Sequence, residues 1–293
     1  MQRHVMRIRN LDKETCWLLA QQAASIPDAK GRTDFMLGRT AVLLFAQFSL
    51  GERLSVTAAV RQMGGYLVYQ GPGDSWHEDI NRYSRQLLPV LDYYVDCLYV
   101  YGMPIQSWDM DIAELPFPVI NAGSARAHPA NALADIVCMK RGSKDFNGVV
   151  ATWLGCANGT LYSLIEAMAY FPFTLRVCLP PHVDASPLKE LADTMKSQVI
   201  FVESPRKAVT GANFIFVGCR GDLSPKDIDL WRLDVELMAR AAPDARLLLS
   251  SVPADVIPME KDVFCSPASL LARQAECRLR VHKRILHWVF SKD

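Results

Sequence analysis

The most informative stretch of this chain is Asn121-Ala-Gly-Ser-Ala-Arg-Ala-His128-Pro129-Ala-Asn131-Ala-Leu-Ala-Asp135. It follows the short apolar run Pro118-Val-Ile-Asn121, which predicts a buried strand. Proline suits the first turn of a helix, because the N–H groups of that turn have no intrahelical partners, so Pro129 predicts a helix start. Apolar residues then recur at helical spacing until Gly142. The stretch therefore indicates a strand, a turn that carries a histidine, and a helix.

The same alternation continues outward in both directions. Before the stretch, strands are predicted at 40–45, 66–69 and 96–101, with a helix that carries Val56 to Met63 and stops at Gly64-Gly65. After a break at 141–148, strands are predicted at 148–155, 174–179, 198–203, 213–217 and 245–251. Strands separated by helices imply parallel pairing with helices on both faces. We therefore expect an α/β fold of two doubly wound parallel-sheet domains.

The predicted domains span residues 1–141 and 148–266, and a long final helix spans 268–290. An N-terminal helix has an apolar stripe at Cys16, Leu19, Ala20 and Ala23. The final helix has its own stripe, which consists of Leu271, Ala275, Leu279, His282, Leu286 and Val289. A basic face of the same helix, formed by Arg278, Arg280, Lys283 and Arg284, is predicted to be solvated, with interfacial salt bridges as the second interpretation.

Composition excludes several classes of function. The 293 residues carry a net charge of +1, so no basic surface indicates a nucleic-acid partner. No apolar run approaches the ~20 residues of a membrane span, and no signal peptide is evident, so we expect a cytoplasmic protein without a membrane partner. The eight cysteines are scattered singly, which favours buried reduced thiols over a disulfide or zinc framework. Neither a metal nor another cofactor is indicated, because Gly155-x-x-x-Gly159 is not a dinucleotide fingerprint.

Three separated segments resemble the aspartate/ornithine carbamoyltransferase family, most of all its ornithine type. They are the loop Ser49-Leu-Gly-Glu-Arg53, the segment His128-Pro129 to Asp135, and the closing segment from Val263 to Arg278. The resemblance covers nearly the whole chain. It implies a carbamoyltransferase fold whose N- and C-terminal helices cross between the domains. The first domain would resemble the family's carbamoyl-phosphate-binding domain, completed by the final helix, and the second its amino-acid-binding domain.

Within that resemblance, His128 is the candidate catalytic residue. In the family this histidine and a glutamine three residues later hold the carbamoyl group, and here the glutamine is replaced by Asn131. Arg126, two residues before His128, could supply a positive charge. The alternatives are that His128 caps the following helix and that Arg126 lies on the surface.

The phosphate-binding positions depart from the family pattern. The family loop reads Ser-Thr-Arg-Thr at a helix N-terminus, whereas this chain has Ser49, Leu50, Gly51 and Glu52. A second family arginine, at a strand end, is replaced by Tyr101. A carboxylate ~4 Å from a phosphate charge is repulsive by several kcal/mol at an effective dielectric constant near 20.

Residues of this loop also have purely structural interpretations. Glu52 could be a favourable carboxylate in a first helical turn, and Ser49 could act as an N-cap. Arg53 survives from the family pattern, but it could instead pair with a nearby carboxylate of the fold.

The amino-acid positions depart as well. The family's Asp-Gly-Asn-Asn becomes Cys156-Ala-Asn158-Gly159, in which Asn158 is retained. The family's His-Cys-Leu-Pro-Arg becomes a segment in which Ser251 replaces the cysteine, Ala254 replaces the arginine and Pro253 is kept.

Two hypotheses about function follow, and whether the chain is an enzyme stays open between them. In the first, the chain is a non-catalytic paralogue with a binding, regulatory or assembly role, for which a transferase subunit is a candidate partner. In the second, it is a divergent transferase that uses the same interdomain cleft with another donor or an amino-acid-like acceptor. The resemblance also implies a homotrimer, in which the loop near Gly73–Glu78 would reach a neighbour's site. A neutral or zwitterionic amino-acid-like molecule is the expected ligand.

Overall fold

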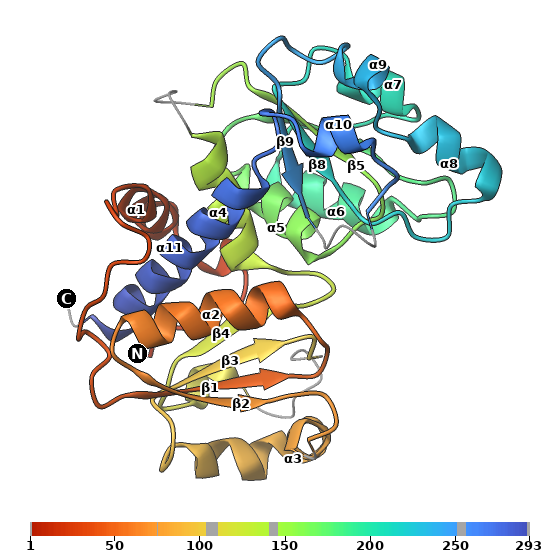
Figure 1. Cartoon of the computed structure of the whole chain (residues 1–293). Coiled ribbons are helices and arrows are strands. Elements are labelled where there is room, and N and C mark those ends of the chain that lie inside the picture. Colours follow the sequence, from red (N-terminus) through yellow and green to blue (C-terminus); the bar gives the residue numbers. More distant parts are fainter. Residues whose placement is uncertain (1, 75, 104–110, 141–145, 251–255, 292–293) are drawn as a thin grey trace. The chain divides into compact units, whose positions relative to one another are not determined.

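A computed structural model describes residues 2–74, 76–103, 111–140, 146–250 and 256–291. The chain divides into two compact units, which are described separately here (Figure 1). Unit 1 comprises residues 1–137 and 275–293, and unit 2 comprises residues 138–274. Each unit contains a parallel sheet, so the predicted fold class is confirmed. The functional division at 1–141 and 148–266 stays a prediction.

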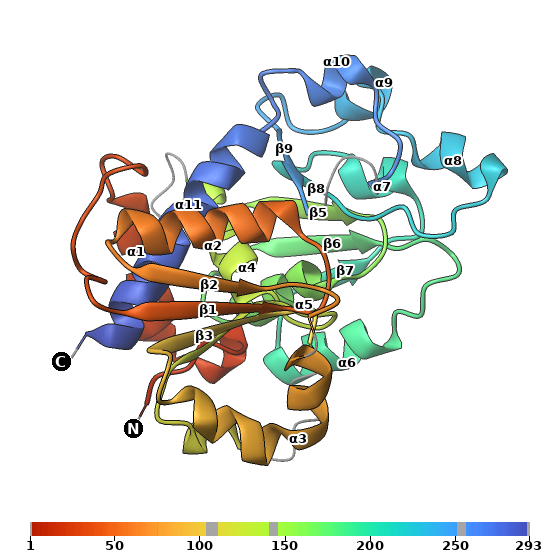
Figure 2. The same cartoon turned by 60° about the horizontal axis from the view of Figure 1, so that its bottom comes forward.

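The sheet of unit 1 has the strand order β2-β1-β3-β4. Its strands are β1 (Thr40–Phe45), β2 (Tyr66–Gln70), β3 (Cys97–Tyr101) and β4 (Val119–Gly123), and all their pairings are parallel. Every strand predicted before residue 141 is present. The two helices α2 (Leu50–Gln62) and α3 (Trp76–Leu91) lie on opposite sides of this sheet (Figures 1 and 2). Because α3 begins at Trp76, the part of the expected loop from 76 to 78 is helical, which corrects that prediction.

The remaining helices of unit 1 are α1 (Lys13–Ala24), α4 (Pro129–Met139) and most of α11 (Leu271–Phe290), with short 3-10 turns at Ile8–Asn10 and Ile112–Glu114. The helix start at Pro129 is confirmed. The predicted stripe of α1 is fully buried, and the Asp12 side chain caps this helix by accepting the Thr15 N–H at 2.6 Å. Helix α11 is tied to the end of α1, because Arg280 donates to the Ala24 carbonyl at 3.3 Å. This contact agrees with the expected packing of the last helix on the first domain.

The prediction that the basic face of α11 is solvated is wrong. Arg280 and Lys283 are each only 7% exposed, whereas Leu271 and Ala275 of the predicted apolar stripe are exposed. Lys283 Nζ donates to the carbonyls of Ala29 and Gly31 at 2.8 and 2.7 Å. Buried cations are tolerated where their donors are satisfied, and here the loop after α1 supplies carbonyl acceptors that no periodicity in α11 could reveal.

The sheet of unit 2 has the strand order β7-β6-β5-β8-β9 and is also parallel throughout. Its strands are β5 (Val150–Leu154), β6 (Thr174–Cys178), β7 (Val199–Phe201), β8 (Phe214–Val217) and β9 (Arg246–Leu249), so all five predicted strands are confirmed. Its helices are α5 (Gly159–Ala167), α6 (Ser186–Met195), α7 (Pro205–Val209), α8 (Pro225–Trp231), α9 (Val235–Met238) and α10 (Lys261–Phe264). The indole of Trp153 on the central strand is fully buried and stacks on Phe216.

All eight cysteines are free, and five of them are buried, as expected for reduced thiols. Across the described residues, no helix is both long enough and apolar enough to cross a membrane. The same residues contain no group of three or more histidine, cysteine or acidic side chains placed to hold a metal ion.

Candidate functional site

The candidate site is built around the first turn of α2 in unit 1. Strand β1 ends at Phe45, and Ser49 caps the following helix by accepting the Glu52 N–H on its Oγ at 3.4 Å. The N-cap interpretation of Ser49 is therefore confirmed. This first turn directs the side chain of Glu52 inward, where the residue is 4% exposed. A buried carboxylate is rare unless other groups compensate its charge.

The side chains of one arginine and two histidines surround this carboxylate (Figure 2 shows α2, α4 and α11 beside the sheet). Glu52 Oε1 lies 3.4 Å from His128 Nε2 and 3.5 Å from Arg278 Nη1, and Glu52 Oε2 lies 3.8 Å from His282 Nε2. His128 comes from the turn before α4, and the other two residues lie one helical turn apart on α11. The carboxylate thus joins three elements that are far apart in sequence. We call Glu52, His128, Arg278 and His282 the internal ion cluster.

The charge of this cluster is fixed by opposing effects on Glu52. Burial alone would raise the pKa of the Glu52 carboxyl, but the Arg278 guanidinium and the His128 imidazole outweigh it and hold the pKa well below its usual range. Glu52 is therefore ionised at neutral pH. Arg278 is the principal counter-charge, since guanidinium stays protonated throughout the physiological range.

His282 lies at the inner end of the cluster. Its side chain is fully buried, and burial lowers its pKa despite the nearby Glu52 carboxylate, so the imidazole is neutral at pH 7. Its ring meets the ring of Tyr99 edge-on, with 5.7 Å between centroids. Among the described residues, the two ring nitrogens of His282 have no hydrogen-bond partner, and the Tyr99 hydroxyl has none either. The inner end therefore combines neutral polar groups with a desolvated carboxylate.

Two glycines leave room for the cluster. Gly123 has φ +142, and a Cβ there would lie 2.9 Å from His128 Nε2, so a larger residue would displace the imidazole. A Cβ at Gly51 would lie 3.3 Å from Arg278 Nη1. The family pattern has an arginine at position 51, and the Cβ of such an arginine would lie next to the Arg278 guanidinium.

The other predicted residues of unit 1 lie around the cluster or away from it. The Tyr101 ring lies 6.4 Å from the His128 ring, measured between centroids. Asn131 is buried one turn after His128, and its Oδ1 has no hydrogen-bond partner among the described residues. Arg126 is exposed, as its surface interpretation expected, and its carbonyl accepts from Arg7 Nη2 at 3.2 Å.

Arg53 corrects the expectation that it pairs with a carboxylate. It is exposed on α2, and its guanidinium lies 4.0 Å from the centre of the Tyr69 ring on the edge strand β2. The adjacent carboxylate of Glu52 turns inward because α2 places successive residues about 100° apart, and so it meets Arg278 instead.

The predicted residues of unit 2 have partly structural roles. Asn158 caps α5, since its Oδ1 accepts the N–H groups of Thr160 and Leu161 at 3.0 and 3.3 Å. Its Nδ2 lies 3.4 Å from Ser250 Oγ, which itself donates to the Val217 carbonyl. This network ties α5 to the ends of β8 and β9. The predicted Ser251 and Pro253 lie outside the described residues.

Sequence reasoning missed two members of the cluster, Arg278 and His282. Arg278 belongs to the basic face for which solvation is the first interpretation and interfacial salt bridges the second, and its ion pair with Glu52 agrees with the second. A usable signal was present, because Arg278 and His282 are four residues apart and therefore share one face of α11. That face continues into the apolar Leu286, which indicates an inward orientation.

Comparison with known proteins agrees with the fold and places the chain in a family. Residues 3–141 match the aspartate/ornithine carbamoyltransferase carbamoyl-P binding domain, and residues 147–289 match the Asp/Orn binding domain of the same family. The chain belongs to the aspartate/ornithine carbamoyltransferase family. It is similar to ornithine carbamoyltransferase of Nitratidesulfovibrio vulgaris (strain DP4), with 29% identity over 303 residues that cover 100% of both chains. The enzyme of that name from Rhodopseudomonas palustris (strain BisA53) is 28% identical over 87% of this chain and 84% of its own length.

Solved structures show the same fold. A mitochondrial ornithine carbamoyltransferase from Coccidioides immitis superposes with a TM-score of 0.84 at 23% identity, covering 98% of this chain and 97% of its own. Ornithine carbamoyltransferase from Pyrococcus furiosus also gives a TM-score of 0.84, at 22% identity, with 97% and 96% covered. Because one fold supports different functions, the site itself must decide the function of this chain.

Proposed function

We propose that this chain is a non-catalytic paralogue of the carbamoyltransferases, in which Glu52 neutralises the groups that would hold carbamoyl phosphate. The observation that carries the proposal is the ion pair of the buried Glu52 carboxylate with Arg278, at 3.5 Å, supported by the His128 contact at 3.4 Å. The family resemblance assigns His128 to the carbamoyl group. A carboxylate already bound to that histidine leaves less positive charge for a substrate anion.

Electrostatics gives this arrangement its effect. A phosphate dianion entering beside Glu52 would meet a like charge in a desolvated site, where the repulsion is screened less than in water. The low pKa of Glu52 means that protonation does not relieve the repulsion at neutral pH. The family's loop arginine is replaced by Gly51, so that position supplies no cation, and Arg53 in the same turn lies over the Tyr69 ring instead. The protein would therefore keep the carbamoyltransferase scaffold for a binding, regulatory or assembly role.

The test measures binding of carbamoyl phosphate and of inorganic phosphate by calorimetry, together with carbamoylation of ornithine and aspartate. We expect neither heat of binding nor product from the natural chain at millimolar anion. Glu52→Thr should gain anion binding because Arg278 and His128 lose their internal counter-ion. Adding Gly51→Arg should strengthen this gain further, since a second guanidinium then stands beside Arg278.

A matched control is Glu236→Thr, which removes an exposed carboxylate that pairs with Arg206 in unit 2. That variant should bind no anion, and circular dichroism should show that both variants are folded. Micromolar affinity of the natural chain for carbamoyl phosphate, or citrulline formation from ornithine, would overturn the proposal.

A divergent transferase is the second candidate, and Asn131 is the observation that favours it. Its Oδ1 is buried without a hydrogen-bond partner among the described residues, one turn after His128. Such an acceptor suits a ligand with an N–H donor, such as a neutral or zwitterionic amino-acid-like molecule. Thermal-shift measurements with ornithine and other amino acids test this candidate. His128→Ala should reduce any ligand-induced stabilisation while the free protein remains folded.

We further propose that the chain assembles as a homotrimer, as the family resemblance implies, rather than with a separate transferase subunit. Support comes from large exposed apolar side chains at the start of α2 and on the edge strand β2: Phe48, Leu50, Leu54, Tyr66 and Val68. Large exposed apolar side chains beside an edge strand are unusual on a monomer and typical of a subunit interface.

Light scattering at micromolar concentration tests the assembly. The natural chain should have the mass of three copies, and Leu50→Glu should reduce it to one. Leu230→Glu is the control, because Leu230 of unit 2 is 70% exposed and Leu50 is 69% exposed. A monomeric natural chain, or equal effects of the two substitutions, would contradict the assembly proposal.

A further inference from the structure

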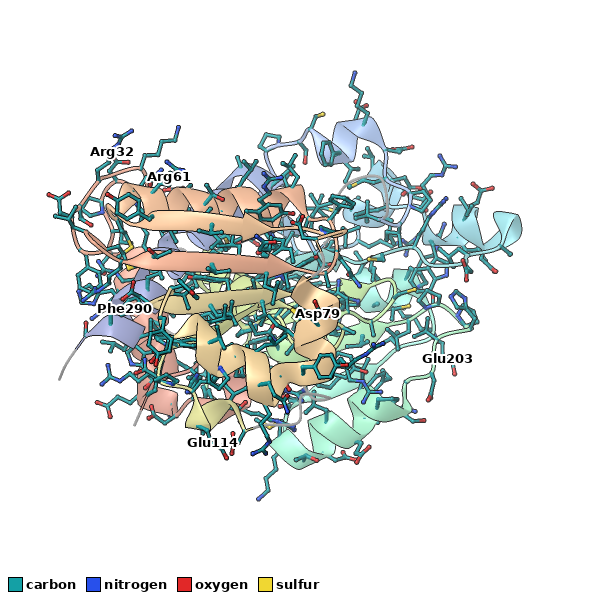
Figure 3. All side chains as sticks on the ribbon, turned by 90° about the horizontal axis from the view of Figure 1, so that it is seen from below. Arg32, Arg61, Asp79, Glu114, Glu203 and Phe290 are labelled. Carbon is teal, nitrogen blue, oxygen red and sulfur yellow. The ribbon has the colours of Figure 1, made fainter. Side chains whose placement is uncertain are left out.

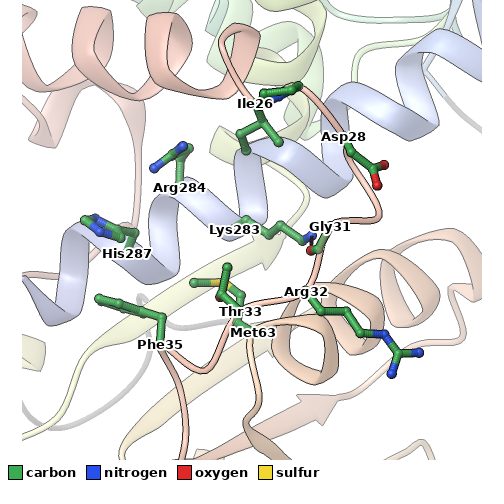
Figure 4. A pocket seen from close by; sticks show the side chains of 11 residues that line it. Ile26, Asp28, Gly31, Arg32, Thr33, Phe35, Met63, Lys283, Arg284 and His287 are labelled. Carbon is green, nitrogen blue, oxygen red and sulfur yellow. Dashed lines mark hydrogen bonds between the residues drawn. The ribbon is translucent and has the colours of Figure 1, made fainter.

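A cavity of about 560 Å³ lies in unit 1 between α11 and the segment that connects α1 to β1 (Figure 4). Its walls are mainly apolar and include Ile26, Pro27, Phe35 and Met63. The helix side carries three basic residues: Lys283, Arg284 and His287. The volume is within the range of small-molecule sites, which combine apolar walls with a few directing polar groups. None of these residues belongs to the internal ion cluster.

Two of the three basic residues are already engaged. Lys283 Nζ donates to the Ala29 and Gly31 carbonyls, as described above. The His287 ring stacks on Phe35 with 4.5 Å between centroids, and its Nδ1 lies 3.1 Å from Ser291 Oγ. Burial, with Arg284 as the second cause, lowers the pKa of His287, so the ring is a neutral wall of the cavity at pH 7.

Arg284 differs from both neighbours. Its side chain forms no hydrogen bond or ion pair with any residue in the described part of the chain, and its Nε is buried. The nearest acidic lining residue, Asp28, accepts the Lys30 N–H at 2.8 Å, and its carboxylate points away from Arg284 (Figure 4). A partly desolvated guanidinium without an anion is unfavourable, and it becomes favourable when a carboxylate forms charge-assisted hydrogen bonds to it.

The other arginine at the cavity, Arg32, does not replace it. Arg32 is exposed, and Figure 3 shows it projecting outward at the same edge as Arg61. Arg284 is therefore the cation that lies against the apolar walls.

We propose that this cavity binds a small carboxylate with an aromatic or branched apolar body. The carboxylate pairs with Arg284, and the apolar body packs against Phe35, Ile26 and Met63. The proposal is independent of whether the internal ion cluster binds anything, since the two sets share no residue.

The experiment uses 1-naphthylacetate and its neutral isostere 1-naphthylacetamide as probes, with calorimetry on the full chain. The natural chain should bind the carboxylate about tenfold more tightly than the amide, because only the carboxylate forms the charge-assisted pair. Arg284→Met should abolish this preference while leaving affinity for the amide unchanged. Arg284→Lys, which keeps the charge, should retain part of the preference.

Two further variants locate the site. Thr33→Trp places a large side chain at the lining without entering the core, and it should weaken both probes together. Arg206→Met removes an exposed, paired arginine of unit 2 and should change neither affinity. Failure of the natural chain to bind the carboxylate at several millimolar, or an unchanged preference in Arg284→Met, would overturn the proposal.

Discussion

Arg278 and Arg284 lie six residues apart on the same helix, yet their charges are treated in opposite ways. Arg278 meets the buried carboxylate of Glu52 at 3.5 Å, whereas Arg284 meets no acid among the described residues and lines a cavity. Between them, Lys283 is satisfied by two backbone carbonyls. One helix thus presents a cation neutralised by an internal anion, a cation held by the backbone, and a cation without a partner. The comparison teaches that two arginines of one helix can differ in whether the fold supplies their counter-charge, and both the proposed anion exclusion at Arg278 and the proposed carboxylate binding at Arg284 rest on that difference.

The largest effect should come from breaking the internal ion cluster. Glu52→Gln leaves Arg278 largely buried without a counter-charge, and we expect a loss of about 3 kcal/mol in the free energy of unfolding of unit 1. The double variant Glu52→Gln with Arg278→Met should lose less than the sum of the single variants, because it leaves no unpaired charge. Urea denaturation of all three variants measures this coupling. Additive losses would show that the two side chains act separately.

Lys283 should show an intermediate effect. Lys283→Met keeps the apolar stem but leaves the Ala29 and Gly31 carbonyls without their donor, so a loss of about 2 kcal/mol is expected. The same denaturation measurement applies. If Lys283→Met is as stable as the natural chain, the backbone carbonyls do not hold this cation in solution.

The stability of the chain should depend on pH through His282 and Glu52 of the internal ion cluster. The pKa of His282 is lowered by burial, so the folded state binds fewer protons than the unfolded chain below the ordinary histidine value near 6.5. Stability from this group is present above that value and is lost as pH falls toward the folded pKa. The lowered pKa of Glu52 acts in the same direction, with its contribution lost only below the ordinary carboxyl value near 4.5.

His282→Gln should therefore flatten the decline in melting temperature between pH 7 and pH 5. Because burial also lowers the pKa values of His4 and His287, a shallower decline should remain in that variant. An identical pH profile for His282→Gln and the natural chain would show that the pKa of His282 is the same in the folded and unfolded states.

Much of the fold could be predicted from the sequence, because buried parallel strands and turn residues leave local signals. The run 40–45 and the helix start at Pro129 are examples in which apolar periodicity and backbone geometry agree. The site was only partly predictable. The sequence predicts the loop and names His128 and Glu52 as site residues. Their partner Arg278, however, is 226 residues from Glu52 in the sequence (278 minus 52). The spacing of Arg278 and His282 indicates an inward helix face, and an interfacial salt bridge is the second interpretation of this basic face, but neither signal identifies Glu52 as the partner.

The smallest effect should come from Arg284. In the absence of ligand, Arg284→Met removes a cation that has no partner among the described residues and leaves an apolar stem beside Phe35 and Met63. We expect unfolding free energy to change by no more than about 0.5 kcal/mol, as at sites without specific interactions. Arg278→Met should destabilise the chain strongly under the same conditions, because it leaves the Glu52 carboxylate buried with only imidazole neighbours. Differential scanning calorimetry of the two variants side by side measures this contrast. Equal losses would mean that Arg284 has a protein partner in solution. The contrast between Arg278, which has an internal counter-charge, and Arg284, which has none, would then be wrong.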